Sequence, residues 1–480
     1  MPRAPGIRYR KSVVDRTQTL SMADDAGGSD VLEAPHLFLV LESHRIAAPP
    51  ARVRLAGFDE ILLGRGEGRR IDPAENQGLV IRAPDPWMSS THARMIRALK
   101  RWVIEDAGSK NGTLVNGAPL TGRVTLEDGD IIEVGHTFFL YRHAQRAMPG
   151  EPAILAMTGE TPPAPGFATL SPDFERDLEK LATVARAAVP VILEGETGTG
   201  KEVMARAIHA LSGRRGEFVA VNCGALPANL IEGELFGHKR GAFSGATEDR
   251  PGLIRAADGG TLLLDEIGEL PASAQAVLLR VLEAREVMPV GATRPVPVDV
   301  RVVAATHRSL DRMVDEGTFR RDLFNRLAGY RARLPPLRDR IEDLGLLVGP
   351  LLARIHPSPL GGAALPALQP KAARALLHCF WPGNIRQLEK ALSSAAALAK
   401  GGAIALDHLP EEVRAAPADP GEAGGREATG EDAAARERLV AMLIEHKGNV
   451  SAVARATGKA RMQVQRWLKR YGLDPERYRG

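Results

Sequence analysis

Short apolar runs separated by turn-forming residues fill the first part of the chain. Between His36 and Arg142, the runs HLFLVLE, RWVIED and DIIEVGHTFFLY are divided by clusters of Gly, Asn and Asp. Successive side chains of a strand point to opposite faces, so short alternating runs predict half-buried strands. We therefore expect an all-β domain over residues 36–143. A disordered polar arm is expected over 1–35, and a Pro-rich linker over 144–165.

The pattern changes near Gly166. The apolar runs VPVILEG, FVAVNCG, GTLLLDEI and VDVRVVAAT alternate with helical periodicity, which begins with a helix at Lys201. This alternation predicts a three-layer α/β fold with a parallel sheet. The chain is therefore multidomain. In chain order we expect an α/β core, a helical stretch, an Ala/Pro/Gly/Glu-rich linker and a small helical domain over 166–334, 335–413, 414–431 and 432–480.

Composition narrows the class of protein. A length of 480 residues suggests about three domains, and 44% apolar with 25% charged residues is typical of chains that fold as globular proteins. Only Cys223 and Cys379 are present, which argues against a disulfide framework and for a reducing compartment. The amino terminus has no apolar signal segment, and no stretch approaches about 18 apolar residues. We expect a soluble cytoplasmic protein without a membrane partner.

The strongest motif is a glycine-rich loop between an apolar strand and a helical run. Its glycines allow backbone N–H groups to surround phosphates, and Lys201 reaches the β- and γ-phosphates of a nucleotide. A structural Gly-rich turn is the alternative, which the strand and helix context disfavours. The loop and the residue after it comprise Gly195, Glu196, Thr197, Gly198, Thr199, Gly200, Lys201 and Glu202.

Glu202 occupies the position where the generic loop has a Ser or Thr that binds Mg²⁺. Asp265, at the end of the run GGTLLLDE, is therefore the expected Mg²⁺ ligand, and Glu266 is expected to polarise the attacking water. A bare strand end is the alternative for this acidic pair. Arg320 and Arg326 are candidate cations for the transferred phosphoryl group, although each could also be a solvated residue on a helix face.

Several longer motifs lie in order over about residues 168–412. GETGTGKE, ELFGHKRGAFSGA, GGTLLLDEIGEL, FRRDLFNRL, RLPPLRDRIEDL and WPGNIRQLE together resemble the AAA+ domain of sigma-54 enhancer-binding proteins. The resemblance implies ATP and Mg²⁺ as ligands, a homo-oligomeric ring, usually a hexamer, and contact with sigma-54 RNA polymerase. The implied sigma-54 contact loop comprises Gly241, Ala242, Phe243, Ser244, Gly245 and Ala246. A buried Phe243 in an ordinary turn is the alternative.

The same resemblance implies individual roles around the nucleotide. Asn222 is expected to be a switch that contacts Glu266, and Thr306 to be sensor I. Arg320 and Arg326 resemble fingers that reach into the neighbouring subunit, and Arg386 resembles the sensor II arginine of a lid. This chain departs from the usual family pattern at four positions, which are Ser244, His307, Arg321 and Asn325. At position 307 the family usually has Asn.

The β-rich region resembles a forkhead-associated (FHA) domain, which binds phosphothreonine peptides. The resemblance rests on LGR, SSTH, GSKNGT and NG, which begin at Leu63, Ser89, Gly108 and Asn116. The implied phosphopeptide-binding residues are Arg65, Ser89, Ser90, Asn111 and Asn116. His92 is expected to brace the loops rather than act as a base, and a decayed fold kept for packing is the alternative. The ligand is a phosphothreonine protein, or this chain's own arm phosphorylated at Thr17 or Thr19.

The carboxy-terminal segment has two helical runs around a Gly turn and a basic third helix, which predicts a helix-turn-helix. It resembles the Fis-like domain at the end of many sigma-54 activators and implies binding to upstream promoter (enhancer) DNA. Asn449 is a candidate helix cap, and Val464, Trp467 and Leu468 are expected to pack inward. A solvated basic helix is the alternative. The candidate DNA contacts are Arg461, Gln463, Gln465, Arg466 and Lys469.

Together these features predict a sigma-54-dependent activator that hydrolyses ATP to remodel the polymerase closed complex, regulated by phosphopeptide binding. Two other classes of function remain open. One is an AAA+ ATPase that remodels a different client, for which the GAFSGA loop has no clear reason. The other is a phosphopeptide-gated repressor with a vestigial ATPase, which the intact Lys201, Asp265 and Glu266 disfavour.

Overall fold

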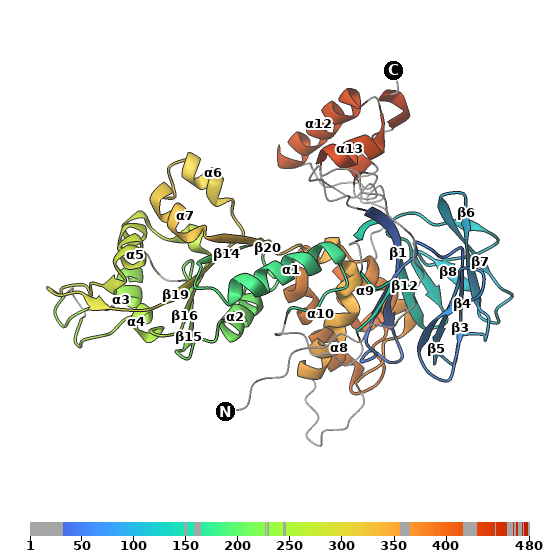
Figure 1. Ribbon diagram of the computed structural model, residues 1–480, viewed down its shortest axis with the longest axis horizontal. Coiled ribbons are helices and arrows are strands. Elements are labelled where there is room, and N and C mark those ends of the chain that lie inside the picture. The colour runs from blue at the N-terminus through green and yellow to red at the C-terminus, as the bar shows by residue number, and fades with distance from the viewer. Residues whose placement is uncertain are drawn as a thin grey trace, which may run out of the picture.

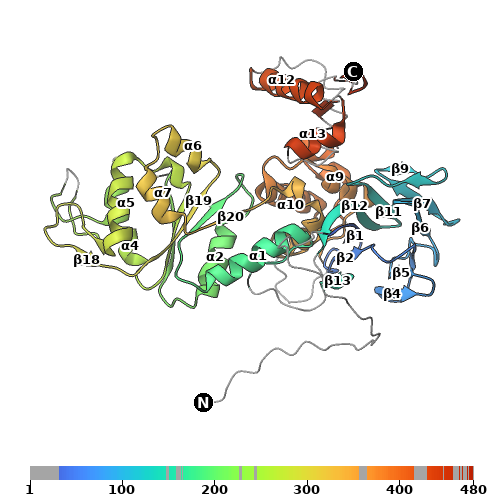
Figure 2. The same ribbon diagram turned by 45° about the horizontal axis from the view of Figure 1, so that its top comes forward.

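The chain folds into a β-sandwich, an α/β core, a helical lid and a small carboxy-terminal helical unit (Figures 1 and 2). The computed structural model describes residues 32–147, 151–157, 164, 166–225, 227, 230–242, 246–355, 365–415, 430–446, 448–457, 464, 467–468, 473 and 475–478. The lid lies between the β-sandwich and the α/β core in both views. Within these ranges, no helix is both long and apolar enough to cross a membrane.

The β-sandwich consists of a seven-stranded sheet in the order β13-β2-β1-β12-β11-β8-β9 and a six-stranded sheet in the order β10-β7-β6-β3-β5-β4. The strands of the first sheet are β1 (Leu32–Glu42), β2 (Ala51–Arg54), β8 (Thr113–Val115), β9 (Ala118–Pro119), β11 (Ile131–Val134), β12 (Thr137–Ala147) and β13 (Ile154–Ala156). Those of the second are β3 (Glu60–Arg65), β4 (Arg70–Ala74), β5 (Gly78–Ala83), β6 (Ala93–Ala98), β7 (Arg101–Asp106) and β10 (Val124–Thr125). The all-β expectation is confirmed.

Two expected boundaries of this domain need correction. The first strand begins at Leu32 rather than near His36, because its first residues pair with the end of β12. The expected linker over 144–165 contributes structure as well: β12 continues to Ala147, and β13 pairs with β2. Loop-like composition did not prevent this short segment from completing the edge of the sheet.

The α/β core has a parallel five-stranded sheet in the order β15-β16-β19-β14-β20, as expected. Its strands are β14 (Val191–Glu194), β15 (Phe218–Asn222), β16 (Thr261–Asp265), β19 (Arg301–Thr306) and β20 (Tyr330–Arg333). Its helices are α1 (Pro172–Ala185), α2 (Lys201–Ser212), α3 (Ile231–Phe236), α4 (Leu253–Ala256), η1 (Ile267–Glu269), α5 (Ala272–Ala284), α6 (Leu310–Asp315) and α7 (Arg321–Leu327). A small hairpin joins β17 (Glu286–Val287) to β18 (Val296–Pro297).

Both faces of this parallel sheet are buried. Along β16, Leu262 and Leu264 belong to one hydrophobic cluster, and Leu263 between them belongs to the cluster on the other face. Side chains alternate along a strand, so a continuous apolar run is what a sheet covered on both faces requires. Three candidates, Asn222, Asp265 and Thr306, end strands β15, β16 and β19, at the edge where an open α/β sheet places its ligand.

The lid follows as a set of helices from η2 onward. Its elements are η2 (Leu337–Asp339), η3 (Ile341–Asp343), α8 (Leu344–Ile355), α9 (Pro370–His378), α10 (Asn384–Ala399), η4 (Leu406–His408) and α11 (Glu411–Arg414). These elements share one hydrophobic core with the β-sandwich. Phe38 and Val40 of β1 pack in this core with lid residues that include Leu344 and Trp381, whereas Leu37 and Leu39 face the interior of the sandwich.

Polar contacts reinforce the junction between sandwich and lid. Arg142 of β12 forms a buried ion pair with Glu342 at 3.1 Å, and Arg374 of α9 pairs with the buried Glu133 at 2.6 Å. At Gly345 of α8, an added Cβ would lie only 1.9 Å from the carbonyl oxygen of Val40. The β-sandwich is therefore packed on the lid backbone to backbone, and a side chain at position 345 would separate them.

The carboxy-terminal unit contains α12 (Gly430–Glu445), α13 (Val450–Thr457) and η5 (Pro475–Tyr478). The oxygen Oδ1 of Asn449 accepts a hydrogen bond from the backbone N–H of Ala452, so the expected cap at α13 is confirmed. Val464 and Leu468 are buried and Trp467 packs against the same cluster, which confirms the inward packing expected for these three residues.

Candidate nucleotide and phosphopeptide sites

The glycine-rich loop joins β14 to α2, where a phosphate-binding loop is required. Gly198 and Gly200 adopt φ values of +81° and +101°, which residues with a side chain rarely adopt. A Cβ at Gly198 would also lie 2.4 Å from the carbonyl oxygen of Gly383 in the lid. These glycines therefore serve two purposes: they turn the loop, and they let the lid approach it closely.

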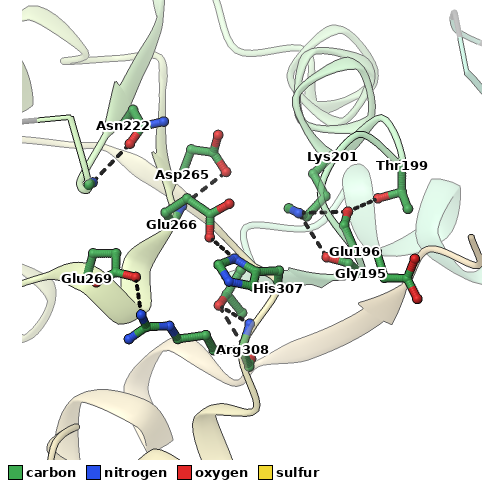
Figure 3. Close-up of polar contacts among 12 residues, drawn as sticks. Gly195, Glu196, Thr199, Lys201, Asn222, Asp265, Glu266, Glu269, His307 and Arg308 are labelled. Carbon is green, nitrogen blue, oxygen red and sulfur yellow. Dashed lines mark hydrogen bonds and ion pairs between the residues drawn. The ribbon is translucent and has the colours of Figure 1, made fainter. Parts of the chain in front are cut away.

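Lys201 begins α2 and is buried beneath the loop. Its Nζ donates to the carbonyl oxygens of Gly195 and Glu196 at 2.9 and 3.2 Å. Burial lowers the pKa of Lys201, while the nearby charges of Glu266 and Asp265 oppose this shift. The ammonium group thus lies between the phosphate loop and the acidic pair (Figure 3), where a transferred phosphoryl group would need a cation.

Asp265 ends β16, and Glu266 follows it in a left-handed conformation with φ +52°. Asp265 Oδ1 accepts the backbone N–H of Glu266 at 3.0 Å. Burial, and after it the charge of Glu266, raises the pKa of Asp265. Two carboxylates crowded in a half-buried site create a demand for positive charge, which fits the expected metal and phosphate chemistry.

No hydrogen bond joins Asn222 to Glu266 in the part of the chain that the structure describes. Its Oδ1 accepts the backbone N–H groups of Gly224 and Ala225 at 2.9 and 3.1 Å. Glu266 is instead held by His307, whose Nδ1 lies 2.6 Å from Oε2 of Glu266 (Figure 3). The sequence marked His307 only as a departure from the family pattern.

Thr306, the sensor I candidate, ends β19 and is buried. Its backbone carbonyl accepts the N–H of Gly195 at 3.2 Å, which ties β19 to the glycine-rich loop. Glu202 pairs with Arg206 at 2.8 Å on an exposed face of α2. Because its side chain pairs with Arg206, we expect only the backbone of Glu202 to contact nucleotide.

The arginine candidates occupy exposed positions. Arg320 pairs with Asp322 at 2.7 Å, and Arg326 donates to the carbonyl oxygen of Leu282 at 3.0 Å. Arg320 immediately precedes α7, Arg326 belongs to it, and both residues are exposed. Arg386 is exposed near the start of lid helix α10, and its charge adds to the effect of burial in lowering the pKa of Lys201.

The sequence motifs did not reveal how the lid holds the phosphate loop. The amide of Asn384 donates to the carbonyl oxygen of Thr197 at 3.1 Å, and the backbone N–H of Ile385 donates to that of Gly198 at 2.9 Å. Arg340 donates to the carbonyl oxygen of Thr199 at 3.0 Å, and Arg338 forms two bonds to the carboxylate of Glu196. The residues that make these bonds lie in the motifs RLPPLRDRIEDL and WPGNIRQLE. The motifs themselves do not indicate that these residues bond the phosphate loop.

The second site lies on the loops of the β-sandwich. The backbone N–H of Arg65 donates to the carbonyl of Ser89 at 2.8 Å, and Ser89 Oγ accepts the N–H of Lys110 at 3.1 Å. The exposed Asn111 donates to the carbonyl of Trp87 at 2.8 Å. The structure therefore brings Arg65, at the end of β3, together with Ser89 and Asn111 from two loops, and Arg65 is exposed.

His92 braces these loops, as expected. Its Nδ1 accepts the N–H of Ser89, and its Nε2 donates to the carbonyl of Gly112, each at 3.0 Å. Ser90 is exposed beside Ser89. Asn116, by contrast, uses its amide to bond Asp130 and the N–H of Ile131, so its side chain stabilises a turn.

The stem of the expected sigma-54 loop is well defined. His238 and Arg250 exchange backbone hydrogen bonds, and the N–H of Gly241 donates to the carbonyl of Ala246 at 2.8 Å. These bonds close the base of the loop that follows α3. Gly241, Ala242 and Ala246 belong to this base, whereas Phe243, Ser244 and Gly245 lie outside the described residues. The DNA-contact candidates Arg461, Gln463, Gln465, Arg466 and Lys469 also lie outside them.

Three family descriptions match separate parts of the chain. "Sigma-54 interaction domain" matches residues 167–332, "AAA+ ATPase lid domain" matches 338–425, and "FHA domain" matches 61–135. These ranges correspond to the α/β core, the lid and the β-sandwich. The fold and its sites thus define an AAA+ protein with an FHA domain.

The regulatory protein AtoC of Escherichia coli (strain K12) is 41% identical over 314 residues, which cover 64% of this chain and 68% of AtoC. The acetoin catabolism regulatory protein of Cupriavidus necator is 43% identical over 341 residues, or 69% of this chain and 48% of that protein. A crystal structure of NtrX from Brucella abortus in complex with ADP is similar at 32% identity and a TM-score of 0.46, covering 64% of this chain and 68% of NtrX. The chain belongs to the sigma-54-dependent transcriptional regulators.

Proposed function

We propose that this protein hydrolyses ATP in an oligomeric ring and uses the energy to remodel sigma-54 RNA polymerase. The observation that carries the proposal is the position of buried Lys201 between the phosphate loop and the pair Asp265 and Glu266, with lid residue Asn384 hydrogen-bonded to the same loop. In this mechanism, backbone N–H groups of the loop and Lys201 bind the phosphates. Glu266 polarises the attacking water, and Arg320 and Arg326 of a neighbouring subunit stabilise the developing charge.

The residues present fit Mg²⁺. Asp265 offers a hard carboxylate oxygen at the edge of the sheet, where burial and, after it, the charge of Glu266 raise its pKa. Within the described ranges there is no cluster of three or more His, Cys, Asp or Glu residues that could hold a metal. Mg²⁺ at nucleotide sites needs only one or two carboxylates, because phosphates and water supply the other ligands. When bound, the ion would neutralise charge on the phosphates.

Capture of sigma-54 tests the remodelling proposal. The full chain, with ADP and a metal fluoride that mimics the transferred phosphoryl group, should retain purified sigma-54, and chain without nucleotide should not. Phe243→Ala should weaken this capture by roughly thirtyfold, since truncating a central aromatic anchor costs about 2 kcal/mol or more. The measurement is the amount of sigma-54 retained as its concentration is varied.

Leu398→Ala is the matched control, because it removes an apolar side chain that is 59% exposed on lid helix α10. It should retain sigma-54 as well as the unchanged protein does. Capture that Phe243→Ala leaves intact would favour a different client for the AAA+ ring. ATP turnover in both variants shows that neither has lost its fold.

We further propose that the FHA domain regulates the ATPase through the lid. The shared core and the ion pairs of Arg142 and Arg374 join the sandwich to the helices that bond the phosphate loop. Asn384 at the start of α10 and Trp381 just before it link the two regions, since Trp381 is buried in the shared core. A phosphopeptide that binds the FHA loops thus contacts a domain packed against the lid, and the lid bonds the phosphate loop.

Arg65→Ala and Ser89→Ala test the phosphopeptide site. Each removes a hydrogen-bond donor to a phosphate, so each should weaken binding to a phosphothreonine peptide library by roughly ten- to a hundredfold. Fluorescence anisotropy with the full chain measures this. Arg97→Ala is the matched control, because Arg97 is an exposed arginine of the same domain that pairs with Asp59 at 3.5 Å. Binding that survives both site variants would indicate an FHA fold retained for packing alone.

The carboxy-terminal unit completes the proposal as a DNA-binding domain that positions the ring at upstream promoter sequences. It has a capped helix α13, and Val464, Trp467 and Leu468 pack inward from the segment that follows. This inward packing assigns one face of that segment to the core and supports an outward role for its basic residues.

A further inference from the structure

The carboxylate of Glu266 is held by a residue outside the two nucleotide-binding motifs. Its Oε2 lies 2.6 Å from Nδ1 of His307, and the two side chains are 19% and 41% exposed. An ionised carboxylate can only accept a hydrogen bond, so Nδ1 of His307 must be the donor. A donor this close to a carboxylate makes a strong bond, and it occupies one of the two oxygens of Glu266 while leaving Oε1 for water.

The backbone at Glu266 shows why such a partner is needed. With φ +52°, this residue adopts the left-handed conformation, which is unfavourable for a residue with a side chain. A strained residue keeps its conformation only where its surroundings hold it. The side chain of Glu266 starts from this turn at the end of β16, and His307 is its partner across the site.

Two adjacent residues after β19 hold the segment after β16. His307 bonds Glu266, and Arg308 pairs with Glu269 at 2.7 Å. Thr306 supports the second of these contacts, because its Oγ1 accepts the backbone N–H of Arg308 at 3.0 Å. The two residues after β19 therefore bond the segment after β16 at two points. Only the bond from His307 involves the carboxylate of Glu266.

Asn222 uses its amide oxygen to accept the N–H groups of Gly224 and Ala225, and among the described residues its amide nitrogen donates no hydrogen bond to Glu266. We propose that His307 is the positioning residue for Glu266 and sets the orientation from which its carboxylate polarises water. This inference rests on the proposed ATPase function. It predicts that His307 affects the rate of the chemical step and leaves nucleotide binding unchanged, because the loop that binds phosphate makes separate contacts.

The test is steady-state ATP turnover by the full chain with His307→Ala, His307→Asn and Arg308→Ala. The amide nitrogen of Asn can occupy nearly the same place as Nδ1 of His, so His307→Asn should keep the bond. His307→Ala should lower kcat roughly tenfold with KM for ATP unchanged, since a misplaced catalytic group can cost up to about a hundredfold. His307→Asn should restore most of the rate. Arg308→Ala should turn over ATP like the unchanged protein, because it loosens the other contact only.

Each outcome decides the matter. Equal kcat in His307→Ala and the unchanged protein would overturn the proposal. So would equal losses in His307→Ala and His307→Asn, or an equal loss in Arg308→Ala, since these would indicate general loosening of the segment. A rise in KM alone would assign His307 to nucleotide binding instead. Absence of turnover in the unchanged protein would refute the ATPase function itself, and fluorescent ATP binding, measured in parallel, separates that result from misfolding.

Discussion

Replacing Glu266 with Gln will reduce ATP turnover by at least about a hundredfold while ATP binding remains, because a general base contributes on this scale. The amide keeps the size of the side chain but cannot accept a proton from water. Lys201→Ala will lose turnover too, but through weaker binding of the phosphates, since its Nζ lies against the loop carbonyls. Steady-state turnover and binding of a fluorescent ATP analogue together distinguish these two losses.

The matched control for the acidic pair is Glu269→Gln. This glutamate lies three residues after Glu266 and pairs with Arg308 rather than with a group of the phosphate site. It should leave turnover within about twofold, as exposed ion pairs contribute little. Turnover that survives both Glu266→Gln and Lys201→Ala would contradict the site assignment. Promoter DNA binding should be the same in all of these variants.

The local parts of the nucleotide site were predictable from sequence because they are contiguous. The loop from Gly195 to Lys201 needs its glycines at fixed positions, and Asp265 and Glu266 end a single buried strand. Their meeting also follows from the fold, since neighbouring parallel strands present their carboxyl ends at one edge. Contacts between distant segments were not predictable in this way. The bonds of Asn384 to the loop and of His307 to Glu266 depend on how the lid and β19 pack in the folded protein.

One long-range feature did leave a signal in the sequence. The runs HLFLVLE in β1 and TFFLY in β12 are almost continuously apolar, whereas a strand with one solvated face alternates. Phe38 and Val40 face the lid core, and Leu37 and Leu39 face the sandwich core. Reading the runs only as half-buried strands predicted an independent domain on a linker. Their continuity indicates instead that a second layer covers the outer face of the sheet.

That second layer makes Gly345→Val the most disruptive single change expected outside the nucleotide site. The new Cβ would lie 1.9 Å from the carbonyl oxygen of Val40, and neither backbone can move without opening the shared core. Helix propensity favours almost any residue over Gly by a few tenths of a kcal/mol, but overpacking costs about 1–3 kcal/mol or more. The cost of the clash therefore exceeds the gain in helix propensity, and the substitution destabilises the protein. We expect the free energy of the first unfolding transition to fall by about 3 kcal/mol. The fluorescence of buried Trp381 monitors this transition.

Ala353→Val is the control for Gly345→Val, because it places the same side chain at an exposed position of the same helix α8. Ala353→Val should lower the free energy of unfolding by about 0.5 kcal/mol, which is the difference in helix propensity between Ala and Val. If the lid transmits phosphopeptide binding, Gly345→Val will also abolish any change in ATP turnover that a phosphothreonine peptide produces, although the peptide still binds Arg65 and Ser89. A full response in Gly345→Val would mean that the FHA domain reaches the ATPase by a route other than the packing of β1 on α8.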